Sequence, residues 1–311
     1  MTGLTSIAIH GGAGTILKGS LTPELEVLYL AALKKAAQVG NAILRNGGSS
    51  IDAVVAAVVE LEDCPLFNAG KGAVFNHLGQ HELDASIMEG KTLDAGAVCG
   101  VRHVRNPILL ARAVMEKSDH VILSGEGAEM FAKALSLPFE DDAYFYTEER
   151  YRQWQKLRGT EVFEMDHTPD GRNKMGTVGA VALDMSGNLA AATSTGGMTN
   201  KKYGRIGDTP VIGAGTYANN TTCAVSCTGH GELFIRSVVA YDISCLMSYK
   251  GLSLKQACDI VVMDKLVSIQ GEGGLIAVDA AGNIEMPFNS EGMYRGSIDQ
   301  NGKEFYGIYK L

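Results

Sequence analysis

Two segments in the second half of the chain follow the same plan. Residues 178–195 (VGAVALDMSGNLAAATST) and 273–289 (GGLIAVDAAGNIEMPFN) each contain two apolar runs joined by an Asp-x-x-Gly-Asn turn. Apolar strands with this turn chemistry predict two antiparallel β-hairpins. Helical patterns lie between them, at residues 231–249 and 253–266. Hairpins covered by helices favour an α+β layered domain over alternating βαβ units.

The first half of the chain has mainly helical patterns. It is expected to open with a short strand, Ser6–Ile9, a glycine turn, and two helices at about 23–46 and 49–63. The alternating stretch 74–88 has Gly79 at its turn and predicts a hairpin. One apolar stripe of the first helix is expected to face the core, namely Leu25, Leu28, Ala32, Leu33 and Ala36. Three later helices are expected at residues 107–117, 125–136 and 147–158. The best linker candidate is the stretch 159–176.

Charge and hydropathy exclude several classes of partner. The chain has 311 residues and a net charge of −8, with no basic run or stripe that would suit nucleic acid or an anionic membrane surface. No apolar run reaches the roughly 18 residues of a membrane span, and the N-terminal stretch lacks the basic region of a signal peptide. We therefore expect a cytoplasmic protein whose six cysteines are reduced thiols.

The hairpin at 178–195 follows directly on Gly176 and Thr177, after the polar linker. A threonine hydroxyl is a weak nucleophile that needs a base within hydrogen-bonding reach. If the chain were cut before Thr177, the freed α-amine, which titrates near ~7.7–8.0, would supply that base. Gly176 has no side chain, so the hydroxyl would be able to approach the preceding carbonyl. Taken alone, the dipeptide is more simply explained as an ordinary strand start.

The segment after this hairpin carries charges on a glycine-rich loop. Thr195 ends the strand paired with that of Thr177, so the two residues are expected side by side. Arg205 and Asp208 suit an amino acid, because a guanidinium can bind the α-carboxylate and a carboxylate can bind the α-amine. Taken alone, Arg205 and Asp208 are somewhat more simply explained as a plain surface ion pair.

A third segment offers hydrogen-bond donors at the start of a helix. Thr228 and Gly229 end an apolar strand, and a helix begins near Gly231. Backbone N–H groups and a hydroxyl at such a position are suitable donors to a developing oxyanion. An ordinary helix N-cap at Thr228 would fit the same residues.

Six motifs in order carry a specific resemblance: IAIHGGAG, CPLFNAG, GTVGAVALD, TSTGG, GRIGD and CTGHGE. With them, nearly the whole chain resembles the isoaspartyl peptidase/plant-type L-asparaginase family of N-terminal-nucleophile hydrolases, above all its bacterial members. The resemblance implies one domain with a four-layer αββα fold, made as an inactive precursor that cuts itself between Gly176 and Thr177. Residues 1–176 would become an α chain and residues 177–311 a β chain, and two such pairs would form an (αβ)₂ assembly.

The resemblance also implies an activity and residue roles. The substrates would be β-aspartyl dipeptides and L-asparagine, hydrolysed to L-aspartate through an acyl-enzyme on Thr177 without a cofactor for the chemistry. Thr195 would orient Thr177, and Asn68 would stand close to this nucleophile. Arg205 would bind the substrate α-carboxylate and Asp208 its α-amine. Thr228 and Gly229 would form the oxyanion hole, and Gly231 would line the amine end of the site.

A structural sodium ion is implied in the loop 61–71. Its ligands would be the backbone carbonyls of Leu61, Glu62, Cys64, Phe67, Ala69 and Lys71. Lys71 departs from the apolar residue expected there, and a nearby ammonium would weaken the affinity for a cation.

Alternatives remain at this stage. A glycosylasparaginase-like amidase would share the fold and nucleophile, and a non-catalytic amino-acid-binding protein could share the scaffold. His77 and His81 have the spacing of a zinc pair, but the predicted hairpin argues against a metal site there. Cys223 and Cys227 lie on one strand face and are expected to be buried thiols.

Overall fold

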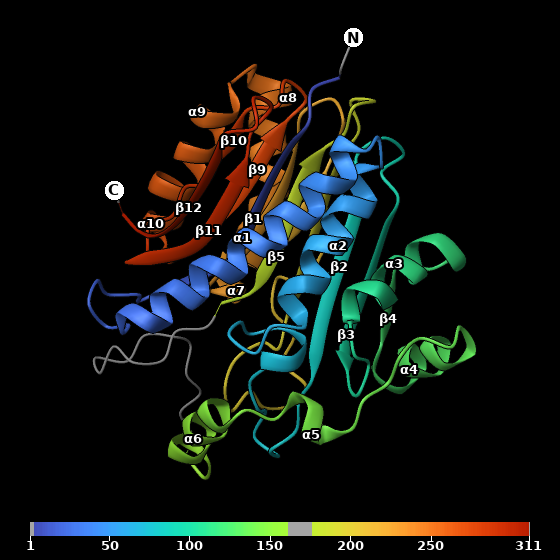
Figure 1. Cartoon of the computed structure of the whole chain (residues 1–311), viewed down its shortest axis with the longest axis vertical. Coiled ribbons are helices and arrows are strands. Elements are labelled where there is room, and N and C mark those ends of the chain that lie inside the picture. Colours follow the sequence, from blue (N-terminus) through green and yellow to red (C-terminus); the bar gives the residue numbers. More distant parts are fainter. Residues whose placement is uncertain (1–2, 161–175, 311) are drawn as a thin grey trace.

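Strand β5 (Val178–Leu183), which starts directly after Thr177, lies inside an eight-stranded sheet. The computed structural model describes residues 3–160 and 176–310, and its helices and sheets make an α+β fold (Figure 1). All neighbouring strands of the large sheet are antiparallel except the β3–β4 pair. Its order is β12 (Glu304–Tyr309), β11 (Gly292–Ile298), β1 (Ser6–Gly14), β5, β6 (Leu189–Thr195), β2 (Leu83–Glu89), β3 (Ala95–Val101) and β4 (Ile122–Ser124).

A smaller antiparallel sheet packs on the large one. Its strands β7, β8 and β9 contact β1, β5, β6 and β2 of the large sheet. The facing strands β5, β6 and β8 are rich in the small residues alanine, glycine, serine and threonine, which allow the two sheets to approach each other. The order of the small sheet is β10 (Ile284–Glu285), β9 (Gly273–Asp279), β8 (Cys223–Gly229) and β7 (Thr216–Ala218).

Helices cover the outer side of each sheet. Figure 1 shows α1 (Pro23–Arg45) and α2 (Ser50–Glu62) side by side across the large sheet, and α3 (Pro107–Lys117) packs on β2 and β3. The remaining first-half helices are α4 (Gly125–Ala134), α5 (Asp142–Phe145), α6 (Glu148–Leu157) and a 3₁₀ turn, Gly70–Gly72. Over the small sheet lie α7 (Gly231–Ser237), α8 (Val239–Lys250), α9 (Leu254–Asp259), a π-helical stretch Ile260–Lys265, and α10 (Leu266–Ser268).

The predicted hairpins at 178–195 and 273–289 are confirmed, as are helices near 23–46, 49–63, 107–117, 125–136 and 147–158. The helix starts follow from local chemistry, since Thr22 and Ser49 accept N–H groups of the first turns of α1 and α2. The predicted helix 231–249 is divided, because Val238 adopts φ 50° and separates α7 from α8. The predicted linker, apart from its ends, lies outside the described residues.

The prediction of a short first strand is wrong. β1 continues through the glycines to Gly14, with a bulge between His10 and Gly12, where Gly12 has φ 111°. Beyond the bulge β1 still pairs with β11, whereas its pairing with β5 reaches only from Ser6 to His10. A bulge of this kind redirects a strand without ending it.

Two further expectations are wrong. The stretch 74–88 is no hairpin, because the Asn76 side chain accepts the N–H groups of Leu78 and Gln80 and closes a local turn before β2. Leu28 is 55% exposed and does not belong to the core face of α1. The other predicted residues do face the core, since Leu33 and Ala36 are buried and Leu25 and Ala32 pack against it partly buried. The buried face also includes Tyr29, Ala37, Gly40 and Leu44.

Within the described residues, no helix is long and apolar enough to cross a membrane. All six cysteines lie in the described part of the chain and are free thiols, and Cys223 and Cys227 are fully buried as predicted.

Candidate active site

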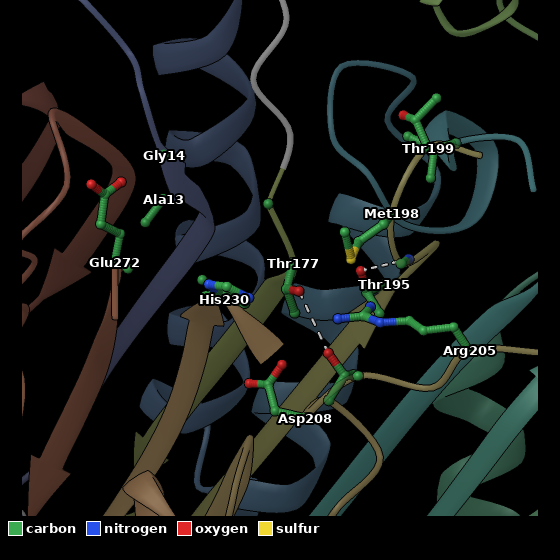
Figure 2. Close-up of a pocket in the computed structure, with 17 residues that line it drawn as sticks. Ala13, Gly14, Thr177, Thr195, Met198, Thr199, Arg205, Asp208, His230 and Glu272 are labelled. Carbon is green, nitrogen blue, oxygen red and sulfur yellow. Dashed lines mark hydrogen bonds between the residues drawn. The ribbon is translucent and has the colours of Figure 1, made fainter. Parts of the chain in front are cut away.

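Thr177 lies at a junction of the two sheets, in a pocket that also contains most of the candidate residues. The β5–β6 register places Val178 opposite Ser194, so Thr177 is opposite Thr195. Figure 2 shows Thr177 between Arg205 and Asp208 on one side and Ala13 and Gly14 on the other. The lining also includes Gly176, Gly197, Met198, Thr199, Gly207, Thr209, Gly229, His230, Glu272 and Gly273.

The residue before Thr177 is pressed against β1. A Cβ built on Gly176 would lie 2.4 Å from the Cα of Gly12, and one built on Gly12 would lie 2.5 Å from the Cα of Gly176. Either contact is far inside van der Waals distance, so both positions require glycine. The β1 bulge thus holds the Gly176–Thr177 peptide at the edge of the pocket.

Both polar groups of Thr177 have hydroxyl partners. Its N–H donates to Thr228 Oγ1 at 3.3 Å, and the same oxygen accepts the N–H of Ala13 at 3.2 Å. The hydroxyl of Thr177 lies 3.5 Å from that of Thr209. The motifs do not single out Thr209, although a hydroxyl directly after Asp208 is a signal for it. Thr195 Oγ1 does not take this place, because it accepts the N–H of Gly197 at 3.0 Å.

Arg205 is held by a carboxylate that sequence analysis also missed. Its Nε and Nη2 donate to the two carboxylate oxygens of Glu232, both at 2.9 Å. Burial alone would raise the pKa of Glu232, but the hydrogen bond and charge of Arg205 outweigh burial and lower it. The guanidinium is thus fixed at the pocket, with its side chain 19% exposed.

Asp208 is a buried carboxyl group with unused acceptor capacity. Its Oδ2 has no hydrogen-bond partner within the described residues. Burial raises the pKa of Asp208 to about 7, while the nearby charge of Arg205 acts in the opposite direction. Gly231 lies beside both residues, since a Cβ there would be 2.8 Å from Arg205 Nη2 and 3.0 Å from Asp208 Oδ1. This end of the pocket therefore has a guanidinium group and a carboxyl group close together, beside Gly231.

Asn68 lies behind the pocket wall and does not line the cavity. Its Nδ2 donates to the carbonyl of Gly197 at 2.7 Å, and its Oδ1 accepts the N–H of Val74 at 3.0 Å. Asn68 therefore ties the loop after β6 to the loop that follows α2.

The space between the sheets contains a chain of buried hydroxyls. Ser86 Oγ donates to the carbonyl of Thr209 at 2.6 Å and lies 2.8 Å from Thr216 Oγ1. Thr216, Thr193 and Ser226 continue the chain, which ends at His10 Nε2. Complete burial lowers the pKa of His10 to about 3, so its ring is neutral at physiological pH, although the backbone of Thr177 acts to raise that pKa.

The predicted sodium-binding segment 61–71 runs from the last turn of α2 to the 3₁₀ turn Gly70–Gly72. A Cβ at Gly70 would lie 2.5 Å from the carbonyl oxygen of Glu62, and one at Gly72 would lie 2.1 Å from that of Phe67. These carbonyl oxygens thus approach Gly70 and Gly72 so closely that neither position has room for a side chain. The ammonium of Lys71 lies over the ring of Tyr144, 5.2 Å from its centroid.

The two histidines with zinc-like spacing, His77 and His81, each lie next to a different backbone carbonyl. His81 Nδ1 lies 3.2 Å from the carbonyl of Val74, and burial lowers the pKa of this histidine to about 4. His77 Nδ1 lies 3.2 Å from the carbonyl of Lys201. In the part of the chain that the structure describes, no group of three or more His, Cys, Asp or Glu side chains could hold a metal ion.

Comparison with known proteins agrees with the resemblance of the motifs. A family model described as asparaginase matches residues 3–308. The isoaspartyl peptidase of Escherichia coli strain K12 is 54% identical over 311 residues, covering 99% of this chain and 97% of the relative. That of Salmonella typhimurium is 54% identical over 98% of each chain. An isoaspartyl peptidase/L-asparaginase of Xenopus laevis is 43% identical, covering 97% and 94%.

The raised pKa of Asp208 predicts a pH-dependent effect of Asp208→Asn on stability. A folded-state pKa of about 7, against ~3.9 when unfolded, means that the neutral carboxyl stabilises the fold. That contribution is complete below about pH 4 and is lost as the pH rises to about 7. Urea denaturation of both proteins in a Thr177→Ala background should show the advantage of Asn growing from pH 4 to 7 and then levelling. A difference in the free energy of unfolding that stays constant with pH would contradict this.

Proposed function

The chain belongs to the asparaginase family, and on that premise we propose that it is a self-cleaving threonine hydrolase. Its substrates are β-aspartyl dipeptides and L-asparagine, and its product is L-aspartate. The position of Thr177 carries the proposal. The residue lies in a pocket whose charges suit an amino acid, and Gly176, directly before it, is packed tightly against Gly12.

Self-cleavage converts the precursor into the enzyme. Thr177 Oγ1 attacks the carbonyl carbon of Gly176, and the peptide C–N bond breaks as the nitrogen of Thr177 takes up a proton. Water hydrolyses the resulting ester, which leaves a carboxyl group on Gly176 and a free α-amine on Thr177. The contact between Gly12 and Gly176 supports this step, because it limits the motion of the carbonyl next to the hydroxyl.

Turnover then uses groups of this chain alone. The α-amine accepts the proton of Thr177 Oγ1 as that oxygen attacks the β-carbonyl carbon of the substrate. The hydroxyl of Thr228 and the N–H of Gly229 stabilise the tetrahedral oxyanion. Thr195, which lies opposite Thr177 in the β5–β6 pairing, orients the nucleophile, and Asn68 holds the loop after Thr195. The amine or ammonia of the substrate's β-amide takes up that proton and leaves, and water then releases aspartate from the acyl-enzyme.

Selectivity comes from the charged end of the pocket. Arg205 binds the α-carboxylate of the aspartyl unit, and Asp208 binds its α-amine next to Gly231. The unpartnered Oδ2 of Asp208 supports this assignment, because an ammonium group would supply the missing donor. The substrate therefore needs a free α-amine and a free α-carboxylate on the same aspartyl unit.

The packing of helices and sheets supports the four-layer αββα sandwich of N-terminal-nucleophile hydrolases. We place residues 1–176 and 177–311 in separate chains after cleavage, and we infer an (αβ)₂ assembly from family membership. The six free thiols fit a reducing compartment, so we assign the enzyme to the cytoplasm.

Hydrolysis of a β-aspartyl dipeptide and of its N-acetyl derivative tests the proposal. The free dipeptide should be hydrolysed with a kcat/KM roughly 100-fold or more above that of the acetylated one, because acetylation removes the charge that pairs with buried Asp208. Thr177→Ala, which lacks the nucleophile, should be inactive on both. Equal rates would contradict the roles of Arg205 and Asp208. Preference for a glycan-linked asparagine would favour a glycosylasparaginase, and aspartate binding without turnover would favour a binding protein.

We further propose that the loop 61–71 binds a structural sodium ion. The carbonyl oxygens of Glu62 and Phe67, which lie close to Gly70 and Gly72, are ligands of the kind that a hard cation prefers. The ring of Tyr144 holds the ammonium of Lys71, which limits its competition with the ion.

Sodium should raise the melting temperature by about 2 °C relative to choline at equal ionic strength, since a bound ion stabilises the folded state. Lys71→Ile should enlarge this difference, and Lys91→Met, at an exposed position, should leave it unchanged. A melting temperature that does not depend on the cation, in wild type and Lys71→Ile alike, would contradict the sodium site.

A further inference from the structure

Lys201 is a buried lysine next to the pocket. Its side chain is 2% exposed, and its ammonium donates to the main-chain carbonyl of Glu82 at 2.9 Å. The Glu82 carboxylate is 3.8 Å away. Burial of an ammonium group costs free energy unless its charge and hydrogen bonds are compensated, so its position calls for a physical reason.

The ammonium lies under one residue of the pocket wall. A Cβ built on Gly197, whose φ is 78°, would be 3.0 Å from Lys201 Nζ. The same glycine donates its N–H to Thr195 Oγ1 at 3.0 Å, and its carbonyl accepts from Asn68 Nδ2 at 2.7 Å. Gly197 is therefore held by two hydrogen bonds, to Thr195 and to Asn68, and the end of the Lys201 side chain occupies the space where a side chain at position 197 would lie.

The strand register connects this turn with the nucleophile. Thr195, at the end of β6, pairs with Asp84 of β2 on one side and lies opposite Thr177 of the β5 segment on the other. Paired residues on adjacent strands share a sheet face, so the three side chains form one row. Burial raises the pKa of Asp84, and the charge of Lys201 acts in the opposite direction. The row thus runs from the buried Asp84 through Thr195 to Thr177.

We propose that Lys201 is a positioning residue for the nucleophile, which acts by fixing the turn Thr195–Gly197 and through it the hydroxyl of Thr195 beside Thr177. This inference rests on the proposed function, in which Thr195 orients Thr177. Lys201 itself does not line the pocket. Its loss should therefore lower the rate of the chemical step more than it weakens substrate binding.

A double-mutant cycle tests the inference. Lys201→Met removes the charge and keeps the length of the stem, Lys201→Arg keeps the charge, and exposed Lys303→Met controls for net charge. With kcat expressed per self-cleaved site, Lys201→Met should lower kcat on the order of tenfold and change KM by less than about threefold. Lys201→Arg should recover most of that loss, and Lys303→Met should match wild type.

The same substitution in a Thr195→Ala background separates positioning from general stability. If Lys201 acts through Thr195, Lys201→Met should cost less than about twofold there, since residues on one path are not additive. A full tenfold loss in both backgrounds, or an unchanged kcat per cleaved site in wild type, would overturn the inference.

A further variant covers the case in which Lys201→Met does not fold, and the rate of self-cleavage covers the case in which wild type does not hydrolyse the proposed substrates. If Lys201→Met does not fold, Lys201→Met/Asp84→Asn removes both buried charges, and a normal kcat in this folded variant would contradict the role. If wild type hydrolyses none of the proposed substrates, the proposed function fails on its own. The cycle is then run on the rate of self-cleavage, which uses the same Thr177, and additive rates would overturn the inference.

Discussion

Gly12 and Gly176 touch through their backbones, and neither position has room for a side chain. The contact depends on the bulge in β1, which lets the strand keep its pairing with β11 while it leaves β5 at His10. The chain then enters β5 at a defined point, with the N–H of Thr177 on the hydroxyl of Thr228. The remainder of the site is arranged around this junction of β1, β5 and β8.

Small side chains between the sheets explain how such a junction stays ordered. The hydroxyls from Ser86 to Ser226 satisfy one another in the interior. One end of their chain, Ser86, holds the carbonyl of Thr209, whose hydroxyl lies beside that of Thr177. Buried polar groups that are fully bonded make an interior rigid and specific. Arg205, held by Glu232, and Asn68, held by two backbone groups, extend the same rigidity to the rim of the pocket and to the loop behind it.

The sequence predicts those parts of the fold that local chemistry decides. The apolar patterns at 23–46 and 49–63 and the two Asp-x-x-Gly-Asn turns identify helices and hairpins without knowledge of the whole. The glycines of β1 were mistaken for a turn because their extended path depends on pairing with β11, near the other end of the chain. The motifs bring Thr177, Thr195, Arg205 and Asp208 into one pocket, as expected. Glu232, Thr209 and Lys201 were missed because their significance comes from contacts across the fold.

The central claim is that the chain cuts itself before Thr177, and a denaturing intact-mass spectrum tests it most directly. Purified wild-type protein and Thr177→Ala are each measured fresh and after prolonged incubation. The account predicts that wild type resolves into residues 1–176 and 177–311, with the second fragment beginning at Thr177, while Thr177→Ala stays whole. A wild-type chain that remains uncut, or a Thr177→Ala chain that is cut at the same bond, would contradict it.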